Sequence, residues 1–189
     1  MEHWLYALMY LSIIGGISLL LMLFKFHYGF IIAFFFHSSL YLCVTIWETD
    51  LWNPVGGMCS GGTWNWSWGL WGLMFMFLIP LTFLTMFVYA QSREEDYKIF
   101  GRRETIEASV FLMLIAGNYF TFGPIEDFGC YVIWGLEKFQ AYAPLFHHDR
   151  FLWGIPNLYY LIIPGIILQG FSFWLSRRLK MRRIKSRAT

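Results

Sequence analysis

Two short segments carry the side chains that could do chemistry. Glu126 and Asp127 stand together after a long apolar stretch, and His147 and His148 follow about twenty residues later. Carboxylate and imidazole groups are ligands that zinc, manganese and iron accept in proteins. We therefore predict a site made of Glu126, Asp127, His147 and His148, which act as ligands of a divalent metal such as zinc or as catalytic residues.

The spacing of these four residues does not identify the site by itself. It is neither the His-Glu-x-x-His pattern of a zinc helix nor the Asp-rich pattern of a calcium loop. Arg150 offers a second interpretation, because buried charges are generally paired. In that interpretation Arg150 and the histidines fasten the loop to the carboxylates, and no ion is held. The sequence leaves both interpretations open.

Three further residues were considered for chemistry. His37 lies inside an apolar stretch, where a histidine is a candidate heme or metal ligand or proton relay. No second histidine lies within a predicted span, so we favour a neutral His37 hydrogen-bonded to a neighbouring helix. Cys59 and Cys130 fall on the same predicted face, where a disulfide and two free thiols are equally compatible with the sequence.

The segments that must position these residues are long and apolar. Of the 189 residues, 58% are hydrophobic and 14% are charged, which is not the composition of a soluble domain. A helix needs about 20 apolar residues to cross a bilayer core of roughly 30 Å. Five stretches meet this requirement, at residues 5–24, 29–47, 68–90, 106–125 and 157–176. We therefore predict an all-α integral membrane bundle of five helices, forming a single domain over residues 1–189.

The basic residues predict the orientation of these helices. Twelve of the fourteen Lys and Arg residues fall on one side of the five spans, seven of them in the tail at 177–189. Only Lys138 and Arg150 fall on the other side. Because basic residues near span ends remain in the cytoplasm, we predict an outer N-terminus and a cytoplasmic C-terminus. The first residues lack the basic region of a signal peptide, so we expect the first span to be retained.

The tail and the tryptophans indicate what the chain contacts. Residues 177–189 contain basic residues and no acidic one, and anionic lipid of the inner leaflet explains this charge better than nucleic acid does. Nine of the ten tryptophans lie at or beyond the outer boundary. They form either an interfacial belt or an aromatic lid that lies on the bilayer, and the sequence leaves both open.

The segments around the acids and histidines also resemble a protein family. Pro124-Ile-Glu-Asp-Phe and His147-His-Asp-Arg-Phe-Leu-Trp-Gly-Ile-Pro-Asn-Leu-Tyr are similar to segments of small, uncharacterised prokaryotic membrane proteins, largely archaeal. The resemblance covers about residues 117–160 and departs from the family pattern at Gly135-Leu136, where the family has Asn-Pro. It implies that the acids and histidines belong together, and it implies no activity.

Two functions are compatible with these observations, and the sequence does not decide whether the chain is an enzyme. In the first, the outer-face site acts on a lipid or lipid-linked substrate. In the second, the chain is a non-enzymatic structural or assembly subunit of a larger membrane complex, which small-residue faces such as Gly15-Gly16 suit. In both we expect a multi-pass protein of a prokaryotic cell membrane, and in the second its partners are other membrane subunits.

Overall fold

The computed structural model describes residues 2–51, 76–85, 102–139 and 151–187. Within these ranges, four helical segments are long and apolar enough to cross a membrane: His3–Leu23, Tyr28–Ile46, Ala108–Trp134 and Asn157–Leu179. A shorter apolar helix, Met76–Thr85, lies inside the third predicted span. The structure therefore supports an all-α membrane architecture. The ends of the span predicted at 68–90 lie outside the described residues.

The main elements follow one another with few regular connections. The long helices are α1 (His3–Leu23), α2 (Tyr28–Leu51), α4 (Arg102–Trp134) and α6 (Ile162–Arg187). Two short 3-10 helices, η2 (Leu136–Lys138) and η3 (Asn157–Leu161), adjoin α4 and α6. A two-stranded hairpin pairs β1 (Phe151–Leu152) antiparallel with β2 (Ile155–Pro156), and Trp153 and Gly154 turn between the strands with positive φ of 50° and 77°.

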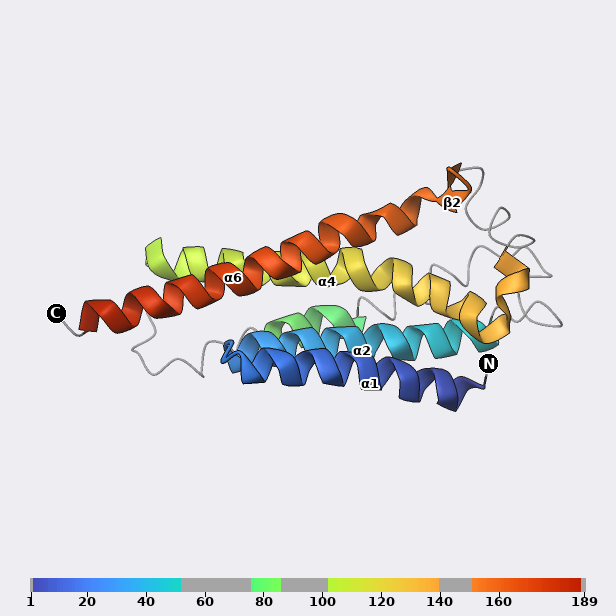
Figure 1. Cartoon of the computed structure of the whole chain (residues 1–189), viewed down its shortest axis with the longest axis horizontal. Coiled ribbons are helices and arrows are strands. Elements are labelled where there is room, and N and C mark those ends of the chain that lie inside the picture. Colours follow the sequence, from blue (N-terminus) through green and yellow to red (C-terminus); the bar gives the residue numbers. More distant parts are fainter. Residues whose placement is uncertain (1, 52–75, 86–101, 140–150, 188–189) are drawn as a thin grey trace.

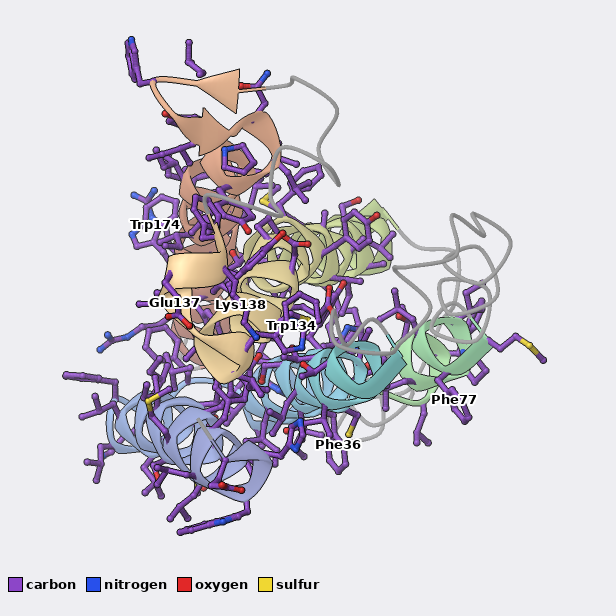
Figure 2. All side chains as sticks on the ribbon, turned by 90° about the vertical axis from the view of Figure 1, so that its right-hand side faces the viewer. Phe36, Phe77, Trp134, Glu137, Lys138 and Trp174 are labelled. Atoms are coloured by element: carbon purple, nitrogen blue, oxygen red, sulfur yellow. The ribbon has the colours of Figure 1, made fainter. Side chains whose placement is uncertain are left out.

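Helix α4 is the centre of the bundle. It packs against α6 on one side and against α2 on the other, and α1 packs mainly on α2 (Figure 1). Figure 2 looks along the bundle and shows the same order, with Met76–Thr85 beside α2. We call the end with the N-terminus, Trp134 and the β-hairpin the hairpin end, and the end with the C-terminus the tail end. The two termini thus lie at opposite ends, as the predicted topology requires; which end faces the cytoplasm stays a prediction.

The segment between α2 and α4 joins opposite ends of the bundle. Leu51 ends α2 at the hairpin end, whereas Arg102 begins α4 at the tail end (Figure 1). The chain must therefore return along the bundle between these two residues, and Met76–Thr85 lies on that route. This connectivity is what a fifth span would provide.

Aromatic side chains fill the contact between α2 and α4 toward the tail end. The ring of Phe30 meets that of Phe111 edge-on at 5.6 Å, and Phe34 lies 5.6 Å from Phe122. Phe173 of α6 joins this group, with its ring centroid 5.9 Å from that of Phe30. These residues are buried, whereas Phe36 and Phe77 point away from the bundle (Figure 2). The outward face of a membrane helix is apolar because it meets lipid.

Helices α4 and α6 approach each other at two glycines. A Cβ on Gly117 would lie 2.9 Å from the backbone nitrogen of Gln169, and one on Gly165 would lie 2.7 Å from that of Thr121. Small residues at a membrane helix contact let the two backbones come close. Beside them Gln169 Nε2 donates a 2.9 Å hydrogen bond to Asn118 Oδ1, and Ser172 donates to the carbonyl of Val110 at 2.7 Å.

The end of α4 differs from the prediction. We expected the span to end at Ile125, with Glu126 and Asp127 at its outer boundary, but the helix continues to Trp134. Pro124 lies inside it, and a proline is tolerated in a membrane helix where neighbouring helices cover the freed carbonyl. Gly135, with φ of 118°, ends the helix instead. The two carboxylates therefore lie within the helix, not at its end.

Candidate functional site

Glu126 is buried where α4 meets α1 and α2. Its side chain is 1% exposed, and it interacts electrostatically with the phenol groups of Tyr6 and Tyr10 on α1 and of Tyr41 on α2. A carboxyl group inside a membrane bundle costs several kcal/mol unless polar groups surround it, and such groups usually mark a functional site. Their phenol groups give the carboxyl group polar surroundings, while the Tyr10 hydroxyl itself donates to the carbonyl of Ser38.

Thr45 fixes this junction of three helices. Its hydroxyl donates to the carbonyl of Glu126 at 3.2 Å and to that of Tyr41 at 3.0 Å, and it shares a side-chain hydrogen bond with Tyr6. Gly129, one turn after Glu126, makes room, because a Cβ there would collide with the Tyr6 hydroxyl and with Thr45 Cγ2. A glycine is therefore required at this position of α4, because the hydroxyl of Tyr6 packs directly against the helix backbone there.

Two further contacts complete this region. Tyr10 donates a 2.9 Å hydrogen bond to the carbonyl of Ser38, which ties α1 to α2. Cys130 is buried one turn beyond Glu126, with its sulfur 3.8 Å from the carbonyl of Thr45. We call the set formed by these side chains the Glu126 cluster: Glu126, Tyr6, Tyr10, Tyr41, Thr45 and Cys130.

Asp127 faces a different neighbour. The hydroxyl of Tyr159, in η3, donates a 2.5 Å hydrogen bond to Asp127 Oδ2. Both side chains are half-buried. The Tyr159 ring packs against Phe128 at 5.9 Å and Phe139 at 6.2 Å, and Phe139 also meets Tyr131 at 5.1 Å. An aromatic group thus holds Tyr159 over α4, at the start of the last helix.

The side chains of Glu126 and Asp127 therefore lie in different surroundings. Neighbouring residues of a helix point about 100° apart and do not face one another. Glu126 points toward α1 and α2, and Asp127 points toward η3. The sequence predicted that both acids form one site with His147 and His148, and this stays a prediction. Cys130 lies between the two surroundings, because it interacts electrostatically with Tyr6 and with Tyr159.

His147 and His148, like Asp149 and Arg150, lie outside the described residues, so neither their contact with the acids nor the Arg150 alternative is tested. The described residues that follow them lead into the last helix. Phe151 pairs with Pro156, directly before η3, and the Tyr160 hydroxyl donates to the carbonyl of Leu152 at 2.9 Å.

In the part of the chain that the structure describes, no group of three or more His, Cys, Asp or Glu side chains could hold a metal ion. The predicted metal set includes His147 and His148, which are not in that part. Cys59 is also outside it, so both alternatives for Cys59 and Cys130, a disulfide and two free thiols, stay open.

His37 is buried in α2, as predicted, with 1% of its surface exposed. Among the described residues its Nε2 atom has no hydrogen-bond partner, so the expected bond from that atom to a neighbouring helix is not seen there. His37 is four residues before Tyr41, and residues at this spacing lie on one face of a helix. It therefore extends the polar face of α2 beyond the Glu126 cluster.

The functional residues that sequence reasoning missed are tyrosines. Tyr6 and Tyr10 stand four apart, as do Tyr41 and Thr45, so each pair marks one helix face. That spacing was a usable signal. Nothing local to Tyr159 indicates that it reaches Asp127, because the contact joins residues 32 positions apart.

No protein-family model, no curated protein and no solved structure matches this chain.

Proposed function

We propose that this integral membrane protein carries, at its hairpin end, a polar site for a lipid or lipid-linked substrate. The observation that carries the proposal is the hydrogen bond between Tyr159 and Asp127, with the buried Glu126 one residue away on the same helix. Polar side chains inside membrane segments are rare and generally functional. Here the two carboxylates lie toward the hairpin end, whereas the contact between α2 and α4 toward the tail end is filled by phenylalanines.

The half-buried Asp127 and Tyr159 are the groups that a substrate could reach. Phe128 and Leu158 beside them are exposed, and they offer an apolar surface to the hydrocarbon part of a lipid. A lipid-linked substrate would place its polar part against Asp127 and its chain against these residues. Glu126, buried behind, would act as an acid or base and would hold Asp127 in place through the rigidity of the Glu126 cluster.

We further propose that this site binds a divalent ion such as zinc. Asp127 fits as one ligand, because its carboxylate is half-buried and accepts a hydrogen bond from Tyr159. His147 and His148 would provide imidazole ligands, and Glu126 is retained as a further ligand or as a base. A bound ion of this kind polarises a carbonyl or phosphoryl oxygen and activates water.

Metal analysis of the purified full-length protein tests this proposal. We expect stoichiometric metal in the unmodified chain and its loss in Asp127→Asn and in His148→Ala. The matched control is Glu137→Gln, which removes an exposed carboxylate at the same end of the bundle (Figure 2). Protein without metal, or with equal metal in all variants, would reject the metal site.

A second candidate is a subunit of a larger membrane complex. The observation that favours it lies on α1, where Gly15 and Gly16 have no atom near the position of a Cβ. Most of the surface of this helix is not covered by the rest of the described chain. A partner helix could approach closely there.

Purification in mild detergent separates the two candidates. A subunit would retain a fixed partner in the unmodified chain and lose it in Gly16→Leu. Gly170→Leu is the matched control, since Gly170 is equally open but lies on α6. A monomer that keeps bound metal supports the first candidate instead.

A further inference from the structure

The exposed face of α6 forms an aromatic ladder that ends in a cation. Phe171 and Trp174 stack with ring centroids 5.4 Å apart and an interplanar angle of 27°. The guanidinium of Arg178 lies over the Trp174 ring, 4.9 Å from its centroid. Phe171 and Trp174 are 46% and 47% exposed. We call Phe171, Trp174 and Arg178 the α6 ladder.

The order of these groups along α6 matches the depth profile of a lipid. Phe171 follows the exposed residues Ile163, Ile166 and Ile167, so it lies on the hydrocarbon side. Tryptophan prefers the interface between hydrocarbon and head groups. Arg178 comes next toward the tail end, where a phosphate would lie. Figure 2 shows Trp174 pointing outward from the bundle.

An open position beside the ladder has room for an acyl chain. Gly170 is exposed and has no atom near the position of a Cβ. It is flanked by Ile166 and Ile167 on one side and by Trp174 on the other, one turn apart. Gly170 therefore leaves an open position beside the ladder, among bulky apolar side chains.

The charge at the top of the ladder selects an anionic occupant. Arg177 is also exposed, and its guanidinium lies 5.7 Å from the ring centroid of Phe26, in the connection between α1 and α2. Stacking on a ring fixes the position of a guanidinium, which can then donate two hydrogen bonds to one phosphate. Residues 177–189 include no acidic residue that would neutralise this charge.

We propose that the α6 ladder, with Gly170 and Arg177, binds one anionic phospholipid of the leaflet at the tail end. The lipid phosphate contacts Arg177 and Arg178, its glycerol region contacts Trp174, and one acyl chain lies over Gly170. This site is independent of the hairpin-end site and would exist in either candidate function. Charge complementarity favours a lipid over a neutral helix, and the apolar steps of the ladder favour it over nucleic acid.

Native mass spectrometry of the full-length protein tests the lipid site. The protein in mild detergent is given an equimolar mixture of phosphatidylglycerol and phosphatidylcholine, and the bound lipids are counted. We expect a preference for phosphatidylglycerol that falls about fivefold in Arg178→Gln, since one cation near an anionic lipid surface contributes about that factor. Lys138→Gln, a loss of the same charge at the hairpin end, should leave the preference unchanged.

A second variant tests the ladder apart from its charge. Trp174→Leu keeps every cation, and we expect it to retain less phosphatidylglycerol than the unmodified chain. Equal retention of both lipids by the unmodified protein would overturn the proposal, and so would a Trp174→Leu variant identical to it. Nucleic acid or an acidic protein that binds through Arg178 and displaces the phospholipid would also overturn it.

Discussion

Helix α4 packs against α6 and against α2 through different kinds of side chains. Toward α6 the backbones meet at Gly117 and Gly165, and a pair of amides joins the helices. Toward α2 the contact consists of large side chains, which change from phenylalanine near the tail end to Tyr41, Thr45 and Glu126 near the hairpin end. In lipid, helices gain little hydrophobic energy by associating, so close packing and hydrogen bonds hold them together.

The comparison separates structure from function. Toward α6 the contact uses small residues, the amide pair and the Ser172 hydrogen bond, and at the hairpin end Asp127 meets Tyr159. The α2 face retains a buried carboxyl group and several hydroxyls, although apolar residues would fill the same space without the cost of removing a carboxylate from water. A protein that keeps such groups in one half of a contact uses them, and the proposed site at Asp127 and Tyr159 lies beside them, with Asp127 on the same turn of α4 as Glu126.

The largest effect is expected in the aromatic part of the α2 face. Phe111 is fully buried and meets Phe30 edge-on. Phe111→Ala should lower the free energy of unfolding by about 3–5 kcal/mol, because it removes a buried ring and leaves a cavity. Thermal unfolding in one detergent measures this, with the exposed Phe36→Ala as control. Equal losses in both variants would mean that the described core does not hold the bundle together.

The next effect concerns the α6 face. Gly165→Ala would place a Cβ beside the hydroxyl and the backbone nitrogen of Thr121, so the helices must separate. We expect a loss of about 1–3 kcal/mol from overpacking. Gly170→Ala, on the open side of α6, should be neutral or slightly stabilising. If the two alanines behave alike in thermal unfolding, the close approach of α4 and α6 is not essential.

A smaller effect is expected at the accessible pair. Tyr159→Phe removes the hydroxyl that donates to Asp127 and should lower stability by about 0.5–1.5 kcal/mol. Asp127→Asn and the double variant complete a thermodynamic cycle. Coupling between the two changes is the expected result. Independent effects would show that the hydrogen bond contributes nothing to stability.

Two further thermodynamic cycles test which acid is energetically coupled to the histidines. The sequence predicts that Glu126 and Asp127 are coupled to His147 and His148. Because the acids point to different neighbours, we expect the Asp127→Asn and His148→Ala pair to deviate from additivity by about 0.5 kcal/mol or more. The Glu126→Gln and His147→Ala pair should deviate less. Strict additivity in both cycles, with single changes near neutral, would mean that the four residues do not form a site.

A labelling experiment, which does not depend on stability, tests which compartment each end of α4 faces. In a chain without its native cysteines, Ser186→Cys should react with an impermeant thiol reagent only after the membrane is opened. The reason is that basic residues surround Ser186, and such segments remain in the cytoplasm. Labelling of this position in intact cells would reverse the predicted orientation of the hairpin end.

The sequence predicted the apolar helices well. Helices α1 and α2 begin within about two residues of the predicted spans, because composition alone distinguishes membrane helices from their connections. The predicted end of the fourth span was wrong, because a proline followed by two carboxylates is typical of the end of a membrane helix. Whether a carboxylate can remain in a membrane helix depends on Tyr6, Tyr10 and Tyr41, which come from other helices and leave no local pattern around Glu126.

The sequence predicted some of the residues of the candidate site, but it did not predict how they are arranged. Glu126 and Asp127 were singled out correctly as unusual polar residues between apolar ones. Their separation could have been derived, since adjacent residues of a continuous helix diverge, but only once α4 was known to continue past Pro124. Tyr159 depends on how η3 meets α4, which is a property of the tertiary fold.

The amide pair between Asn118 and Gln169 also sets an order of assembly. These residues are 51 positions apart, so α4 is synthesised and inserted before its partner exists. Until α6 arrives, the Asn118 amide and the bare backbone at Gly117 have no partner from α6. The insertion of the last helix then closes this contact, and in the same step it brings Tyr159 to Asp127. Maturation of the candidate site is therefore tied to completion of the chain, and a chain truncated before residue 157 would contain both acids without the site.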